Sequence, residues 1–120
     1  MPRFRLRSPR LKVVENDVER ACCDLLALRG YKVHRLHCGR AQFPDGRWVT
    51  LEEEGMPDWL VVHPLYPAFY VETKRPGAEL SPAQAWMHRV LIHGWRLRVA
   101  VIDDPAELAE WLSAHEKATR

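Results

Sequence analysis

Three side chains stand at a spacing that could assemble a site for metal-assisted chemistry. Asp58 follows a proline, and Glu72 and Lys74 end a later run that is rich in β-forming residues. Alternate side chains share one face of a β-strand, so Glu72 and Lys74 should project to the same side. If the strand that begins at Asp58 pairs with the strand that ends at Lys74, Asp58 comes close to Glu72. Two carboxylates and an ammonium group would then converge.

This combination suits a hard divalent cation. Mg²⁺ and Mn²⁺ accept oxygen ligands and keep several waters, and nearby carboxylates repel one another unless a cation lies between them. In phosphodiester hydrolysis the cation would polarise the phosphate, while Lys74 would orient the attacking water or stabilise the transition state. An isolated E-x-K tripeptide is also common as a pair of surface charges on a hairpin. Its position after a Pro-Asp pair that opens another strand favours the metal site.

The rest of the sequence predicts the elements that must hold these residues. We expect one helix over residues 14–29, a second that opens at Ser81 and ends at Gly94, and a third that is capped at Asp104. The expected strands span residues 31–38, 47–51, 58–63, 68–74 and 95–102, with a hairpin turn at 43–46 between the first two. This order predicts a single α/β domain over residues 14–116, after a basic arm at 1–13 and before a tail at 117–120.

Charge and composition limit the compartment and the partners. A net charge of +2 does not by itself indicate a nucleic-acid partner. Before Glu15, however, all charged residues are basic, which is typical of an arm that neutralises phosphates, a solvated tail or a transit peptide. The three cysteines form no disulfide framework, and no segment is apolar enough for a secretory signal or a membrane span. We expect a soluble, intracellular protein with no membrane partner, and the cytoplasm as its default location.

Several motifs occur together in a characteristic order. A glutamate begins the expected first helix (Glu15), and a G-x-P-D motif (55–58) and an E-x-K motif (72–74) follow it. After these come a glycine (Gly77), a Leu-Ser pair (80–81), a glutamine (Gln84) and a second glycine (Gly94). In this order the chain resembles the VRR-NUC family, a branch of the PD-(D/E)XK nuclease superfamily. The resemblance runs from about Glu15 to Leu112, and the joint order is more specific than any single motif.

This resemblance implies a restriction-endonuclease-like architecture, in which α-helices flank a mixed β-sheet. It also implies cleavage of DNA that depends on Mg²⁺ or Mn²⁺, often at branched, junction or flap structures. Some small members are similar to homodimeric junction-resolving enzymes. We therefore expect a homodimer that binds branched or duplex DNA inside a bacterial or phage-infected cell.

The same resemblance assigns roles to individual residues. Carried over one by one, it makes Asp58 and Glu72 metal ligands and the Thr73 main-chain carbonyl a further oxygen ligand. Lys74 takes the part of the catalytic lysine. Glu15 matches the glutamate of the first helix, which would reach toward the metal or its water.

Two of these assignments stay open. Glu19 lies one helical turn after Glu15 and could exchange roles with it, and either glutamate could be a solvated acid that the helix dipole favours. Gln84 matches a family glutamine near the active site, but a capping box formed with Ser81 explains it equally well. The two roles of Gln84 compete for one side chain.

A basic and aromatic segment offers a candidate surface for DNA. Trp48 lies in the expected hairpin with Arg40 and Arg47, a combination that could stack on an unpaired base and contact phosphate. The structural alternative for Trp48 is a half-buried strand residue. Arg75, directly after Lys74, could add to a phosphate-binding surface.

The main alternative to a nuclease is a catalytically silent module that binds nucleic acid or dimerises on the same fold. Against it stands the intact set of two carboxylates and a lysine, which a binding module does not need. We interpret His88 and His93 as helix-surface or satisfied core histidines, and Cys22 as an inert thiol on the apolar face of the first helix.

Overall fold

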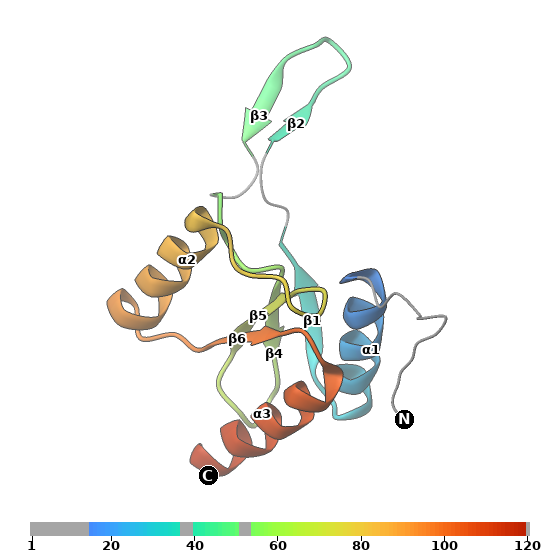
Figure 1. The fold of residues 1–120 in the computed structure, drawn as a ribbon, viewed down its shortest axis with the longest axis vertical. Coiled ribbons are helices and arrows are strands. Elements are labelled where there is room, and N and C mark those ends of the chain that lie inside the picture. Colours follow the sequence, from blue (N-terminus) through green and yellow to red (C-terminus); the bar gives the residue numbers. More distant parts are fainter. Residues whose placement is uncertain (1–14, 37–39, 51–53, 120) are drawn as a thin grey trace.

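Three α-helices and a four-stranded mixed sheet form the body of the protein, as the α/β class predicts (Figure 1). The computed structural model describes residues 15–36, 40–50 and 54–119, without the side chains of residues 15–16, 40–41 and 49–50. The helices are α1 (Glu15–Leu28), α2 (Pro82–Arg89), the π-helical turn η1 (Val90–Gly94) and α3 (Pro105–Ala118). The strands are β1 (Lys32–Arg35), β2 (Arg40–Gln42), β3 (Trp48–Thr50), β4 (Trp59–Val62), β5 (Phe69–Thr73) and β6 (Val99–Ile102). None of the helices in these ranges is long and apolar enough to cross a membrane.

The sheet has the strand order β1-β4-β5-β6. β1 and β5 each lie antiparallel to β4, whereas β6 runs parallel to β5. A parallel neighbour requires a crossover, and α2 with η1 supplies it. The predicted pairing of the two strands that carry Asp58 and Glu72 is confirmed, because Trp59 lies opposite Val71. Asp58 therefore enters the sheet beside the end of β5.

The expected hairpin between strands at 31–38 and 47–51 is wrong. β1 ends at Arg35 and pairs with β4, and a separate, short hairpin is formed by β2 and β3 around the turn at 43–46. Figure 1 shows this hairpin projecting away from the body. The β2–β3 hairpin lies between residues 31 and 51, where the hairpin was expected, but the strand that follows α1 belongs to the main sheet.

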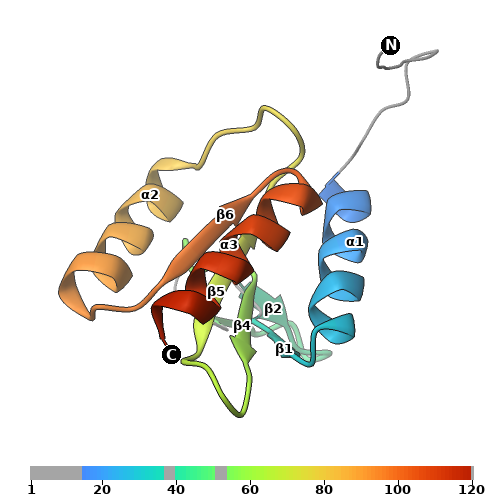
Figure 2. The ribbon, with the colours of Figure 1, turned by 90° about the horizontal axis from the view of Figure 1, so that it is seen from below.

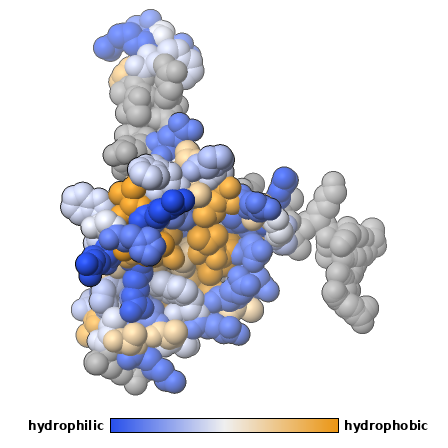
Figure 3. All heavy atoms as spheres, turned by 60° about the vertical axis from the view of Figure 1, so that its left-hand side comes forward, coloured by the Kyte–Doolittle hydropathy of each residue, from blue (hydrophilic) through white to orange (hydrophobic). Residues whose placement is uncertain are grey.

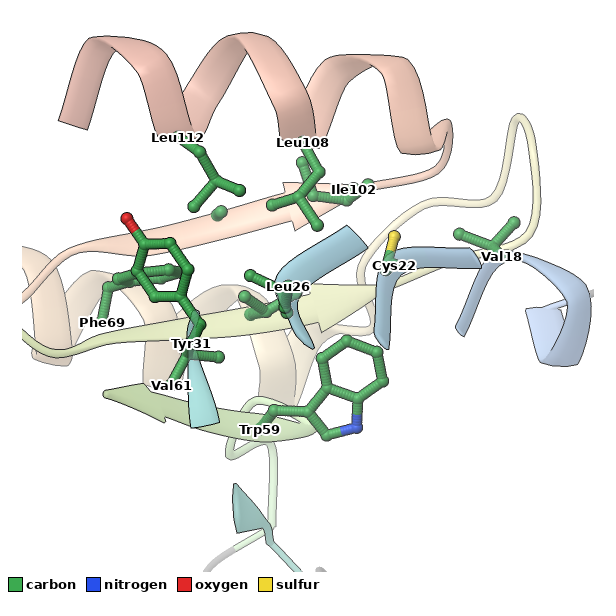
Figure 4. Close-up of a cluster of buried hydrophobic side chains, with 12 residues drawn as sticks. Val18, Cys22, Leu26, Tyr31, Trp59, Val61, Phe69, Ile102, Leu108 and Leu112 are labelled. Carbon is green, nitrogen blue, oxygen red and sulfur yellow. The ribbon is translucent and has the colours of Figure 1, made fainter. Parts of the chain in front are cut away.

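The hydrophobic core lies between the sheet and the pair α1 and α3. Figure 2 shows these two helices on one side of the sheet, with α2 apart from them on the other side of β6. Leu108 and Leu112 of α3 and Leu26 of α1 are fully buried in one cluster with Val61 of β4 (Figure 4). Val71 of β5 belongs to the same cluster. Cys22 lies in this core, and burial, aided by neighbouring Cys23 and Asp104, raises the pKa of its thiol to about 12. The prediction that this thiol is a core group is confirmed.

Helix α2 begins at the predicted cap. Ser81 Oγ accepts a hydrogen bond from the Gln84 backbone N–H at 3.1 Å, and Gln84 Oε1 accepts one from the Ser81 backbone N–H. The helix then changes to the π-helical turn η1, which ends at Gly94 as the sequence predicts. Figure 3, with the left-hand side of Figure 1 brought forward, shows hydrophobic residues at the surface between hydrophilic ones. The exposed large apolar residues of α2, of the segment after η1 and of β6 include Trp86, Trp95 and Val101.

Candidate active site

Glu72 is a buried carboxylate on the face of β5 that α2 covers. Its neighbours Val71 and Thr73 point to the opposite face, where Val71 joins the hydrophobic core. Only 1% of the surface of Glu72 is exposed. An ionised carboxylate in such a place requires hydrogen-bond donors or a cation. The contacts of Glu72 therefore define the site.

Gln84 joins Glu72 to Lys74. Its amide nitrogen donates to Glu72 Oε2 at 3.2 Å, and its Oε1 accepts from Lys74 Nζ at 2.7 Å. The same Oε1 accepts from the Ser81 backbone N–H at 2.9 Å. Lysine and backbone N–H groups can only donate and a carboxylate accepts, so the orientation of the amide follows from its partners. One side chain therefore completes the capping box predicted for Gln84 and also contacts Glu72 and Lys74.

Asp58 is held by the residue that separates Glu72 from Lys74. Its Oδ2 accepts from the Thr73 backbone N–H at 2.8 Å and from Thr73 Oγ1 at 2.9 Å. Two donors on one oxygen fix the carboxylate beside the end of β5.

The electrostatics of Glu72 follow from this crowding. Burial raises the pKa of Glu72, the imidazole of His88 opposes the rise, the charge of Asp58 adds to it, and Lys74 opposes it. The net direction is upward. A second carboxylate near a buried one is costly unless a cation compensates, so the ionised pair favours a bound cation.

A close backbone approach positions α2 over the Asp58 segment. Gly55 has a φ of +91°, and a Cβ atom at this position would overlap the Ala83 carbonyl group. Since only glycine combines this φ with such a contact, the first residue of the G-x-P-D motif lets the chain before Asp58 lie directly against the first turn of α2. Gln84, in that turn, is thereby placed over β5.

His88 is a site residue that the sequence interpretation missed. Its side chain is buried and lies against Glu72, with Nε2 at 3.4 Å from Oε1. The interpretation as a surface or satisfied core histidine is wrong, because the side chain is buried and neither of these two atoms has a hydrogen-bond partner in the described part of the chain. A signal was present in the sequence, since His88 follows Gln84 by four residues and so shares its helical face. The exposure of His93 agrees with its interpretation as a surface residue.

The glutamates of the first helix do not join this network through any described contact. Glu15 is the first residue of α1, and its side chain lies outside the described residues. Glu19 lies 3.7 Å from Arg35, whose guanidinium also stands over the Trp59 ring at 5.8 Å. Glu19 thus has a structural partner on β1.

The predicted DNA-contacting residues are spread over two places. Arg75 is exposed directly after Lys74, next to the site. In the hairpin, Trp48 is 57% exposed, whereas Arg47 is paired with Asp45 at 2.8 Å and lies over the Phe43 ring at 5.0 Å. Arg40 lies in β2, and its side chain is outside the described residues.

The residues that could hold a metal are Asp58 and Glu72, through their carboxylates, and the Thr73 carbonyl stays a predicted third oxygen. In the part of the chain that the structure describes, no three histidine, cysteine, aspartate or glutamate side chains are close enough to hold a metal ion.

Neither the protein-family models nor the curated proteins contain a match to this chain. The function of this chain must therefore be inferred from its sequence motifs and from the geometry of the site.

Proposed function

We propose that the protein is a divalent-metal-dependent DNA endonuclease of the VRR-NUC type. The observation that supports this most strongly is the hydrogen-bonded chain from Lys74 through Gln84 to Glu72, with Asp58 fixed beside it. These residues come from the entry to β4, from β5 and from α2. A surface pattern of charges would not require a buried carboxylate or a glutamine between the acid and the lysine.

The donor set fits Mg²⁺ or Mn²⁺. These ions bind through one or two carboxylates and complete their coordination with waters and substrate phosphates. Asp58 offers its Oδ1, and Glu72 offers Oε1, a buried oxygen that has no hydrogen-bond partner among the described residues. A bound ion would supply Lewis acidity to the scissile phosphate and acidify a water. Two protein carboxylates would be sufficient to bind the ion, because waters and substrate oxygens supply the further ligands.

Lys74 would act on the substrate side of this pair. Its ammonium group has three N–H donors, and one of them is used by Gln84. The remaining donors can bind a phosphate oxygen or orient the attacking water, where a fixed positive charge stabilises the transition state. Gln84 limits the motion of a flexible side chain and so lowers the entropy that is lost when substrate binds.

The exposed Arg75 and the β2–β3 hairpin support DNA as the substrate. Arg75 can contact phosphate beside the site, and Trp48 offers an aromatic face to an unpaired base. Preference for branched, junction or flap DNA and a homodimeric assembly stay predictions. A homodimer would bring two sites to two strands, and light scattering of the protein with and without DNA measures it.

The test is cleavage of labelled four-way junction, flap, duplex and single-stranded DNA with Mg²⁺, Mn²⁺ or EDTA. Asp58→Asn and Lys74→Met should each lower the cleavage rate by about a hundredfold or more. Glu110→Gln and Lys117→Met remove the same charges on α3 and should cut at the wild-type rate. Binding of DNA without metal-dependent cutting of any substrate would support the catalytically silent module instead.

A further inference from the structure

His88 and Glu72 face each other in a buried part of the site. The side chain of His88 is 6% exposed and that of Glu72 is 1% exposed, and Nε2 lies 3.4 Å from Oε1. Both atoms are fully removed from solvent, and neither has a hydrogen-bond partner among the described residues. A buried polar atom without a partner costs roughly 1–3 kcal/mol. Two such atoms that face each other in the interior therefore call for a functional or structural explanation.

A small movement converts the contact into a hydrogen bond. N–H···O bonds span about 2.7–3.2 Å and prefer a nearly linear N–H, so the imidazole must come a few tenths of an ångström closer and turn its N–H toward Oε1. His88 lies one turn after Gln84 on the same face of α2. The two residues therefore approach the two oxygens of Glu72 from one helix, Gln84 at Oε2 and His88 at Oε1.

Two donors on one helix would fix the carboxylate plane of Glu72. Each carboxylate oxygen has two lone pairs, so a hydrogen bond to Oε1 leaves another lone pair for a cation. Carboxylates that bind metals are themselves commonly hydrogen-bonded, and removal of such a partner typically weakens metal binding by about 10–100-fold. His88 also favours the ionised form of Glu72, against the effect of burial.

We propose that His88 is a positioning residue, which donates Nε2–H to Glu72 Oε1 and so orients this carboxylate for a divalent cation. The inference builds on the proposed function, because it assigns a partner to one of the metal ligands. His88 touches neither the substrate nor the cation in this role. The imidazole of His115, which is buried with partners on both nitrogens, provides a matched histidine outside the site.

The experiment measures Mn²⁺ binding to the DNA-free protein by titration calorimetry. His88→Leu removes the donor and should weaken Mn²⁺ binding by about tenfold or more. His88→Gln places an amide N–H near the position of Nε2 and should restore binding to within about threefold of the wild type. His88→Asn, whose amide is too short to reach Oε1, should bind like the leucine variant. His115→Gln should bind like the wild type.

Melting curves show that each variant compared is folded, and the Gln and Asn variants decide the question if the leucine variant unfolds. Wild-type affinity in the leucine and asparagine variants would overturn the role of His88 and leave the proposed function intact. Absence of Mn²⁺ binding by the wild type would overturn both. The Mg²⁺ concentration for half-maximal cleavage should rise in His88→Leu, with a smaller change in the maximal rate.

Discussion

The side-chain oxygen of Gln84 accepts a hydrogen bond from the ammonium group of Lys74 at 2.7 Å. The same oxygen caps α2 by accepting the Ser81 backbone N–H, and the amide nitrogen donates to Glu72. Helix initiation and site assembly are therefore coupled through one side chain. Formation of the first turn of α2 places the lysine and the buried carboxylate at a fixed separation.

Replacement of Gln84 should affect both stability and cleavage. Gln84→Ala removes the returning bond of the capping box and leaves Glu72 Oε2 without its donor, so we expect a loss of about 1–3 kcal/mol in the free energy of unfolding. Cleavage should fall by about tenfold or more, because Lys74 and Glu72 lose their common partner. Urea denaturation and initial cleavage rates provide the two measurements.

Ser81→Ala is the matched control for that variant. It removes the N-cap oxygen and should cost about 1 kcal/mol, but it keeps both contacts of Gln84 with the site. Cleavage by this variant should stay close to the wild-type rate at a temperature where both are folded. An equal loss of activity in the two variants would mean that only the stability of α2 matters.

The hydroxyl of Thr73 should support Asp58. Thr73→Val keeps the shape of the side chain but leaves Asp58 Oδ2 with the backbone N–H alone, so stability should fall by about 1 kcal/mol. Mn²⁺ affinity, measured by calorimetry, should fall several-fold because the carboxylate is held less firmly. Thr73→Ser retains the hydroxyl, and its affinity should lie closer to the wild type than that of the valine variant.

Gly55→Ala should be more harmful than other glycine substitutions. Gly55, Gly46 and Gly77 all have a positive φ, between +79° and +95°, but only at Gly55 would a Cβ atom overlap backbone atoms of Ala83. Alanine at Gly46 or Gly77 should cost about 1–2 kcal/mol from backbone strain. Gly55→Ala should cost clearly more and should also lower cleavage, because Gln84 must shift. Equal midpoints of denaturation in the three variants would exclude this account.

His115 should make stability depend on pH. Burial lowers the pKa of His115, a bond to the Pro67 carbonyl raises it, and Arg98 lowers it, with a downward net direction. The unfolded chain therefore binds the proton more readily. Stability is fully present above the unfolded-state pKa of about 6.5 and is lost as the pH falls through the folded-state value.

Urea denaturation at several pH values between about 5 and 7.5 measures this dependence. His115→Gln should flatten the profile in that window, whereas His93→Gln, at an exposed position, should not. If the stability of His115→Gln changes with pH as steeply as that of the wild type, another group is responsible for the dependence.

Glu116 contributes to the pH dependence of stability in a lower pH range. Partial burial raises the pKa of Glu116, but hydrogen bonds from Tyr31 and Arg29 prevail and lower it, so its contribution to stability is lost only below about pH 4.5.

The sequence predicted those parts of the fold that depend on interactions between residues close together in the chain. The Ser81–Gln84 box, the cap at Asp104 and the glycine at the end of η1 depend on neighbours within a few residues. The alternation of Glu72 and Lys74 follows from strand geometry. Their convergence with Asp58 required only one hairpin, β4–β5, and was predictable for that reason.

Long-range partners were not predictable in the same way. The partner of β1 is β4, which lies beyond the β2–β3 hairpin, and strand composition does not distinguish this pairing from a local one. His88 was missed because its burial depends on how α2 lies on the sheet. The π-helical turn after Arg89 likewise reflects packing rather than helix propensity.

The strand order has a consequence for the evolution of this scaffold. β1 and β4 are adjacent and antiparallel, so the segment that contains β2 and β3 is topologically a long connection between two neighbouring strands. Insertions and exchanges are tolerated best at such places, because strand order and register in the body do not change. If the chain from Gly55 onward is kept, this connection between β1 and β4 could be shortened, lengthened or replaced without a change in the main sheet. Under the proposed function, such a change would alter the contacts with DNA while Asp58, Glu72 and Lys74 stay in place.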